Sequence, residues 1–122
     1  MDKPFVDPPE GPAPTELQII DLDVGSGPEA AAGKRVAVHY VGVTYSSGEE
    51  FDSSFDRGQP LVFDLGAGRV IPGWDNGLVG MKVGGRRRLV IPPHLAYGSR
   101  GAGGVIGPGE TLIFVCDLVG VR

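Results

Sequence analysis

The chain has 122 residues, 41% of them hydrophobic and 21% charged, with a formal net charge of −4 at pH 7. This length suits a single hydrophobic core, and the negative charge disfavours nucleic acid as a partner. Because no apolar run is long enough to span a membrane, and because the acidic, proline-rich N-terminus is unlike a signal peptide, we expect a cytoplasmic protein without a membrane partner.

The N-terminal residues 1–15 contain prolines at positions 4, 8, 9, 12 and 14. Such a composition is typical of an extended, flexible tail, so we expect the folded domain to occupy residues 16–122. The segment "LQIIDLDVG" at 17–25 predicts the first strand. The alternating segment "KRVAVHYVGVTY" at 34–45 predicts a second strand, which the turn "SSGEE" joins to "FDSS" at 51–54 as a hairpin.

Three more strands are predicted after this hairpin, at 60–65, 86–92 and 110–122, each with apolar side chains on one face. Only one segment has the features of a helix. It begins at Pro72, because proline is favoured at the first helical position, and it runs to about Gly80. A curved, mostly antiparallel sheet of five to six strands wrapped around one short helix is an α+β domain.

The side chains that commonly carry metal or nucleophilic chemistry are few. Cys116 is the only cysteine and lies in the apolar run "TLIFVCDLVGV", which favours a buried packing role. His39 and His94 are too few to form a metal cluster. The basic run "GRRRL" at 85–89 is typical of a solvated face. We therefore expect no metal, no cofactor and no intramolecular disulfide.

The stretch "LVFDLGAGRVIPGW" at 61–74 supports two interpretations. Its first half resembles a loop that holds S-adenosylmethionine or a dinucleotide. That loop needs a third glycine where this chain has Val70 and Ile71, followed by Pro72, and the chain has no room for the repeated βαβ units of such folds. We therefore reject a nucleotide site here, and the second half of the stretch, which contains the only tryptophan, becomes the informative part.

Trp74 is predicted to lie one turn into the helix, across the concave face of the sheet. Aromatic residues from five other segments are available to surround it: Tyr40, Phe51, Phe63, Tyr97 and Phe114. A lone tryptophan on a short helix is most often part of the core, whereas an aromatic cluster around it can also line a ligand pocket. Both interpretations stay open on these residues alone.

Several longer segments resemble one protein family. They are "VHYVG", "FDSSFDRGQP", "FDLGAGRVIPGWDNGLVGMKVGGRRRLVIPPHLAYG" and "TLIFVCDLVGV", and they are similar, in order and without apparent gaps over about residues 17–122, to the FKBP-type peptidyl-prolyl isomerases. The resemblance implies the FKBP-like fold and an enzyme that accelerates rotation about X-Pro bonds. It also implies a monomer whose partners are prolyl peptides and unfolded proteins, with the macrolides tacrolimus and rapamycin as further ligands.

The resemblance assigns residues to a pocket. Trp74 is implied as its floor, and the Ile71 N–H and the Tyr97 hydroxyl are implied as donors to carbonyl groups of the ligand. The implied pocket residues are Tyr40, Phe51, Asp52, Arg57, Phe63, Val70, Ile71, Trp74, Tyr97, Val105, Ile106 and Phe114. Those implied to be catalytic are Asp52, Tyr97 and Trp74.

Two further roles follow from the same resemblance. Asp52 matches a residue near the twisting amide, held by partners that correspond to Tyr40 and Arg57. The glycine-rich loop "AYGSRGAGGVIGPGE" matches a flap over the pocket, with Val105 and Ile106 at its apolar tip. We therefore expect this loop to cover the pocket.

Other interpretations of these residues remain. Asp52 followed by two serines is also typical of a turn, and Phe63 and Phe114 alternate as core residues whether or not a ligand binds. A non-catalytic binding or chaperone module would use the same pocket. The chain also departs from the best-known small members of the family, which have a phenylalanine at the position of Leu61 and an acidic residue at that of Arg69. These departures leave the macrolide affinity and the preference for the residue before proline open.

Overall fold

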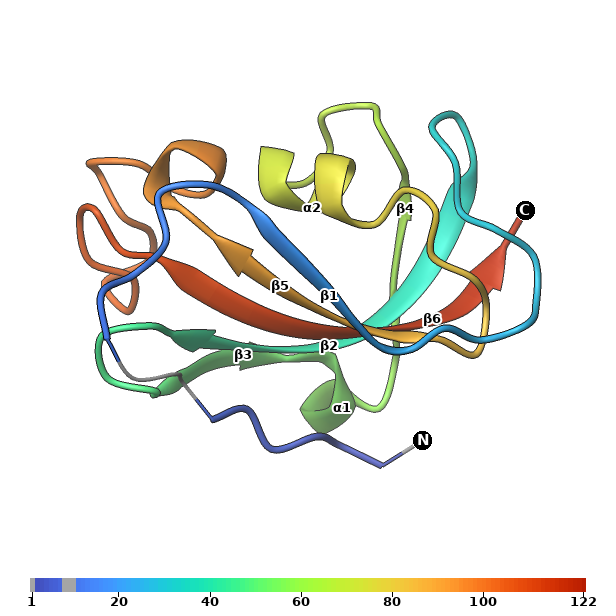
Figure 1. The fold of residues 1–122 in the computed structure, drawn as a ribbon, viewed down its shortest axis with the longest axis horizontal. Coiled ribbons are helices and arrows are strands. Elements are labelled where there is room, and N and C mark those ends of the chain that lie inside the picture. Colours follow the sequence, from blue (N-terminus) through green and yellow to red (C-terminus); the bar gives the residue numbers. More distant parts are fainter. Residues whose placement is uncertain (1, 8–10) are drawn as a thin grey trace.

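The fold is given by a computed structural model that describes residues 2–7 and 11–122. Its main feature is one antiparallel sheet in the order β1-β5-β6-β2-β3, with β4 paired to the first part of β2 (Figure 1). The strands are β1 (Gln18–Asp23), β2 (Arg35–Thr44), β3 (Glu50–Ser53), β4 (Leu61–Asp64), β5 (Arg86–Ile91) and β6 (Leu112–Val121). Two α-helices, α1 (Ser54–Arg57) and α2 (Pro72–Gly77), and a 3-10 turn (Pro93–Leu95) lie between strands. The predicted α+β fold with an antiparallel sheet is confirmed.

The helices need a correction, because the sequence predicts only one. The strand predicted at 51–54 is β3 and lies one residue earlier, at Glu50–Ser53, because Ser54 already begins α1. Gly58 ends α1 with a φ of 71°. The predicted helix is α2, but it ends at Gly77 and not near Gly80, which adopts a left-handed φ of 89°. In the described part of the chain, no helix has the length and apolar character needed to cross a membrane.

The main hydrophobic core lies between the concave face of the sheet and α2. The alternation predicted for β2 is confirmed, since Val36, Val38 and Tyr40 are all buried in this core. α2 lies close to β5 because it presents glycine to that strand: a Cβ on Gly73 would lie 2.5 Å from Cγ2 of Ile91. This close approach brings the first turn of α2 onto the sheet.

The arginine run at 86–88 is not simply a solvated face, which corrects that prediction. Arg87 is buried and donates hydrogen bonds to the carbonyl oxygens of Gly77 at 2.8 Å and Val79 at 3.0 Å, and to Asp21 at 2.6 Å. Carbonyl groups at the end of a helix have no intrahelical partner. Arg87 supplies one, and it thereby fastens the end of α2 to the sheet.

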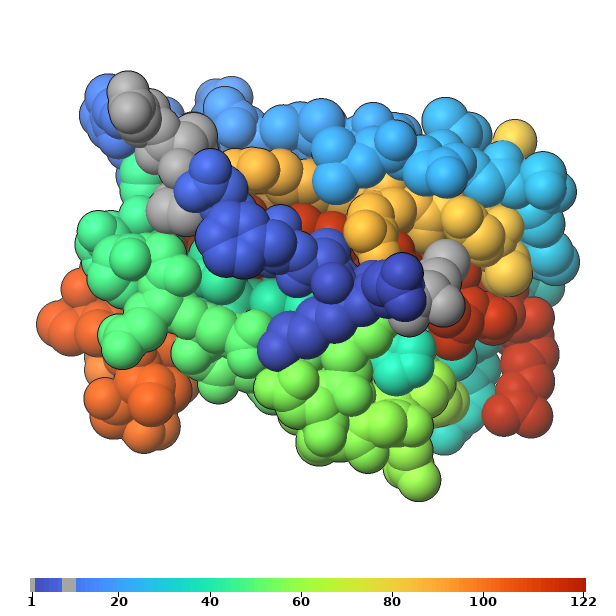
Figure 2. Space-filling view, turned by 90° about the horizontal axis from the view of Figure 1, so that it is seen from below, coloured from blue at the N-terminus to red at the C-terminus, as the bar shows by residue number. Residues whose placement is uncertain are grey.

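The convex face of the sheet carries a second apolar cluster, made of Val6, Val41, Val43, Val90, Ile113 and Val115. Residues 2–7 lie across this face (Figure 2), and Val6 is only 5% exposed. The flexibility expected for residues 1–15 stays a prediction, and residues 8–10 lie outside the described part. Residues 2–7, however, pack on the folded domain and do not stand apart from it.

Candidate functional site

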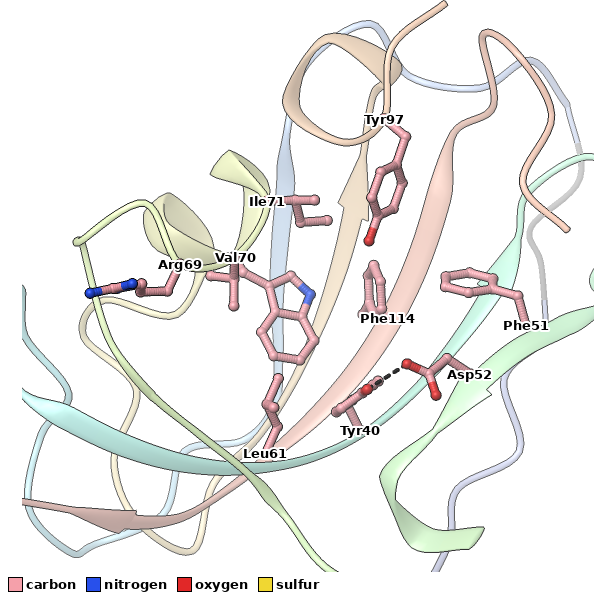
Figure 3. A pocket seen from close by; sticks show the side chains of 10 residues that line it. Tyr40, Phe51, Asp52, Leu61, Arg69, Val70, Ile71, Tyr97 and Phe114 are labelled. Atoms are coloured by element: carbon pink, nitrogen blue, oxygen red, sulfur yellow. Dashed lines mark hydrogen bonds between the residues drawn. The ribbon is translucent and has the colours of Figure 1, made fainter. Parts of the chain in front are cut away.

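A cavity of about 180 Å³ opens between α2 and the concave face of the sheet (Figure 3). Its size suits a single small ring, because pockets for drug-sized ligands are larger. Its walls come from β2, β3, β4, β6, α2 and two loops. The lining residues are Tyr40, Phe51, Asp52, Leu61, Arg69, Val70, Ile71, Trp74, Tyr97 and Phe114.

Trp74 is the most deeply buried aromatic side chain of this lining, at 3% exposure. Its ring centroid lies 4.9 Å from that of Tyr40, 5.3 Å from that of Phe114 and 5.7 Å from that of Phe63. The first two pairs are edge-to-face, and such pairs each add about 0.5–1.5 kcal/mol beyond the burial of their area. The aromatic cluster predicted around Trp74 is therefore present, and it is at once part of the core and the wall of a cavity.

The loop before α2 sets the position of Trp74. Pro72 occupies the first turn of α2, and Ile71 has a φ of −58° and a ψ of 148°, as expected for a residue that precedes proline. The N–H of Trp74 then donates to the carbonyl oxygen of Ile71 at 2.9 Å. The indole is thus placed one short turn after an extended residue, over the concave face.

The glycine loop that resembles a nucleotide-binding loop is closed by a side chain of α2. Asp75 accepts hydrogen bonds from the N–H groups of Gly66 at 2.9 Å and Gly68 at 3.0 Å. A phosphate-binding loop needs such N–H groups for its ligand. Because a carboxylate already occupies them here, the loop supports the aromatic cavity and does not bind phosphate.

Asp52 lies at the cavity wall in a cluster with Tyr40 and Arg57. The Tyr40 hydroxyl donates to Oδ2 of Asp52 at 2.5 Å, while Arg57 donates to Oδ1 at 2.6 Å and to the Tyr40 hydroxyl oxygen at 2.8 Å. Burial alone would raise the pKa of Asp52, but these hydrogen bonds and the Arg57 charge outweigh it and hold that pKa below its ordinary value. Burial, reinforced by the carboxylate, raises the pKa of Tyr40 to about 12.

This cluster therefore holds a fixed charge and no mobile proton at neutral pH. Asp52 is an ionised acceptor, and Tyr40 is a neutral donor already bonded to it. General acid or base catalysis needs a group whose pKa lies near the working pH, which neither residue has. What the cluster offers a ligand is the carboxylate side of the Asp52–Arg57 ion pair, held in a set position at the cavity wall.

Several hydrogen-bond donors of the lining lack an acceptor among the described residues. They include the main-chain N–H of Ile71, the hydroxyl of Tyr97 and the buried indole N–H of Trp74. In Figure 3 the Tyr97 hydroxyl points into the cavity, and burial, with the charge of Asp52 as a second cause, raises the pKa of Tyr97. A buried unsatisfied donor such as the Trp74 indole is rare in folded proteins unless a ligand or water accepts from it. The cavity is thus suited to an apolar ring flanked by carbonyl groups.

Eight of the twelve residues expected in the pocket line this cavity, and four do not. Arg57 lies behind the carboxylate that it bonds, and Phe63 is buried in the core. Ile106 is also buried in the core, while Val105 is 64% exposed, so neither lines this cavity, and their cover of a bound ligand stays a prediction. The reason is the tight turn that Ile106 closes with Ala102, with hydrogen bonds in both directions at 2.9 and 3.0 Å.

Leu61 and Arg69 line the cavity although they were not assigned to it from the sequence. Leu61 precedes Phe63 by two residues on β4, so the alternation that places Phe63 inward also places Leu61 on the same face. Arg69 directly precedes Val70 in the loop before α2. At both positions the sequence departs from the best-known small members of the family.

A family model described as FKBP-type peptidyl-prolyl cis-trans isomerase matches residues 27–119. The FK506-binding protein of Streptomyces anulatus is 66% identical over 122 residues, which cover 99% of this chain and 98% of the relative. The probable FK506-binding protein of Corynebacterium glutamicum is 54% identical over 119 residues, which cover 98% of each chain. These relatives match along almost their whole length.

Solved structures give the same result for the fold. The crystal structure of AtFKBP13 superposes with a TM-score of 0.81 at 44% identity, covering 90% of this chain and 96% of that one. The crystal structure of FkpA from Escherichia coli superposes with a TM-score of 0.78 at 42% identity, covering 87% of this chain and 48% of that one. The second match therefore concerns only part of the larger chain.

Proposed function

Because this chain belongs to the FKBP-type peptidyl-prolyl cis-trans isomerase family, we propose that it accelerates cis-trans rotation of X-Pro bonds in peptides and folding proteins. The observation that carries the proposal is the aromatic cavity of about 180 Å³, which presents donors that have no acceptor among the described residues. A prolyl residue is complementary to it, since it has an apolar ring, a carbonyl group on either side and no N–H of its own.

The reaction requires no bond to be made or broken. Rotation about the peptide bond has a barrier of about 18–20 kcal/mol, because the planar amide is stabilised by resonance. The planar amide is also more dipolar than the twisted one, so an apolar, water-poor cavity penalises the ground state more than the transition state. Lowering the barrier by about 4 kcal/mol would speed rotation roughly a thousandfold.

Asp52 contributes electrostatically in this proposal. Its carboxylate stays ionised because Tyr40 and Arg57 hold it, and its position at the wall is fixed by the same bonds. A fixed negative charge favours the state in which a nearby carbonyl oxygen carries less negative charge, and that is the twisted amide. Tyr97 and the Ile71 N–H act by binding, since each offers a hydrogen bond to a carbonyl of the substrate.

A second candidate is a prolyl-peptide binding or chaperone module with little turnover. The observation that favours it is the open side of the cavity: Tyr97 is 39% exposed, Val105 is 64% exposed, and no residue of the loop 98–110 is among the lining residues. An uncovered cavity excludes water less well, which weakens the catalytic effect of burial while leaving the ring contacts in place. Tacrolimus binding is proposed for either case, from the names of the two relatives.

The test is the rate of cis-to-trans isomerisation of a short Leu-Pro peptide. Wild type should accelerate it, Trp74→Leu and Asp52→Ala should lower kcat/KM at least tenfold, and Tyr97→Phe should act mainly on KM. Tyr45→Phe is the matched control, because its hydroxyl bonds main-chain carbonyls of residues 11 and 12 outside the cavity. An unchanged rate with wild type, together with binding of the peptide, would favour the binding module.

A further inference from the structure

A groove runs along β4 and adjoins the cavity at Leu61, Arg69 and Val70. Its lining residues are Arg35, Leu61, Val62, Phe63, Asp64, Arg69 and Val70. Three of these also line the cavity, so the groove and the cavity are continuous. Arg35 is paired with Asp64 at 3.1 Å, whereas Arg69 has no side-chain partner among the described residues. This groove therefore carries one cation that is not neutralised by the described part of the chain.

A second groove leaves the cavity on the side of Phe51, between the β2-β3 turn and the loop 98–110. Its lining residues are Thr44, Glu49, Glu50, Phe51, Gly104 and Val105. Glu50 is paired with Lys3 at 3.0 Å. The carboxylate of Glu49 has no partner among the described residues, so this groove carries an anion where the first carries a cation.

The proline cavity thus lies between two grooves of opposite charge. Figure 3 shows Arg69 and Phe51 on opposite sides of the cavity, and Phe51 is the residue shared with the acidic groove. A peptide in extended conformation advances about 3.3 Å per residue, so the residues on the two sides of a bound proline are carried out along the two grooves. Their charges then meet charges of fixed and opposite sign.

We propose that this polarity selects the substrate: the site takes prolyl segments with an acidic residue on one side of the proline and a basic residue on the other, in one order along the chain. The acidic residue lies toward Arg69 and the basic residue toward Glu49. This inference rests on the proposed function, since it describes the flanks of the proline site. It deepens that function by naming the substrate class.

The size of the effect follows from the exposure of the two groups. A single exposed ion pair changes an affinity by a small factor. In one order both peptide charges attract the groove charges, and in the reverse order both repel them, so the difference between the two orders is larger than that of one pair. We therefore expect one order to be preferred about tenfold at low salt, and the preference to fall toward onefold near molar salt, where screening is strong.

The experiment compares peptides of identical composition and net charge. In each pair one peptide reads Glu-before-proline and Lys-after, and its partner reads the reverse, with the charges placed one, two or three residues from the proline. Both kcat/KM for isomerisation and affinity, from the fluorescence of Trp74, are measured for each peptide. Because the members of a pair have the same net charge, the overall charge of −4 acts equally on both.

Wild type should prefer one order, and the double variant Arg69→Glu with Glu49→Lys should prefer the opposite order. A control with the same changes at Lys82 and Glu16, which line neither groove nor the cavity, should keep the wild-type preference. Equal values for both orders in every pair, by rate and by affinity, would overturn the inference. A neutral Leu-Pro peptide separates the two claims. If it is isomerised while the charged pairs show no preference for either order, the inference fails and the isomerase proposal stands. If no peptide is isomerised or bound, both fail.

Discussion

Replacing Gly42 by alanine should move two walls of the cavity without touching any polar group. Gly42 lies in β2, directly opposite Phe114 of β6 and Asp52 of β3. A Cβ at this position would lie 2.6 Å from Cζ of Phe51 and 2.7 Å from Cε1 of Phe114. Carbon atoms pack at about 3.5–4.0 Å, so both rings have to move by about 1 Å.

The cost of that movement has two parts. Overpacking a dense core typically costs about 1–3 kcal/mol. The ring centroids of Phe51 and Phe114 lie 5.5 Å apart in an edge-to-face pair, which contributes about 0.5–1.5 kcal/mol that the shift weakens. Alanine in a strand is favoured over glycine by about 0.5–1 kcal/mol. The net loss of unfolding free energy for Gly42→Ala should therefore be about 1–3 kcal/mol.

Gly120→Ala is the matched control, because Gly120 lies in β6 and a Cβ there would be 3.6 Å from Cβ of Ala37, an ordinary contact. Urea unfolding should show a lower midpoint for Gly42→Ala and an equal or higher midpoint for Gly120→Ala. Isomerisation of a Leu-Pro peptide should lose kcat/KM only in Gly42→Ala. If both variants keep the wild-type midpoint and rate, the tight packing of Phe51 and Phe114 on β2 is not what shapes the cavity.

Three further predictions concern single side chains. The pKa of Asp52 is lower in the folded state, so the ionised carboxylate stabilises the fold above its unfolded pKa of about 3.9, and this stabilisation is lost as the pH falls through the folded pKa. The unfolding free energy of wild type minus that of Asp52→Asn should therefore become smaller from pH 7 to about pH 2.5. An increase of this difference on acidification would contradict the prediction. Arg87→Met should lower the unfolding free energy by about 2–4 kcal/mol in urea, because it leaves the buried carbonyl of Gly77, the partly buried carbonyl of Val79 and the carboxylate of Asp21 without their partner. The partly exposed Arg88→Met should stay within about 0.5 kcal/mol, and equal losses for the two would contradict the buried role of Arg87. Cys116 is fully buried, and burial raises the pKa of its thiol, so a thiol reagent should modify it in urea but hardly at all in the folded protein; rapid reaction without urea would refute this.

The strands could be predicted because their side chains alternate. In β2 and β6 the same period places every second residue in the core, and Leu112, Phe114, Cys116 and Leu118 are all buried as that period requires. The start of α2 could also be predicted, because Pro72 both fixes the first turn and holds the residue before it extended. These features depend on near neighbours in the sequence, which is why one sequence suffices for them.

Features that depend on residues far apart in the sequence could not be predicted. Nothing near Arg87 in the sequence indicates that its two arginine neighbours stay accessible while it is buried below the end of α2. The burial of Val6 depends on apolar side chains that three strands bring together on the convex face, and the proline-rich composition around it pointed to a detached tail. α1 is only four residues long, which is too short for a periodic pattern.

The candidate site shows the same division. Trp74 follows the Ile71-Pro72 signal, and Tyr40, Phe63 and Phe114 alternate inward on their strands, so this part of the aromatic cluster could be predicted. The outward turn of Val105 was not predicted, because it depends on the hydrogen bonds that Ile106 makes with Ala102 across the loop. The catalytic roles assigned by resemblance stay predictions.

The most direct test of the central claim is a tacrolimus titration that follows two signals in one sample. The first is the isomerisation rate of a Leu-Pro peptide, and the second is the fluorescence of Trp74, the only tryptophan of the chain. If catalysis takes place in the cavity that Trp74 lines, both signals should change together and end at the same ratio of ligand to protein. A rate that stays constant while the fluorescence saturates would place catalysis outside this cavity and contradict the account.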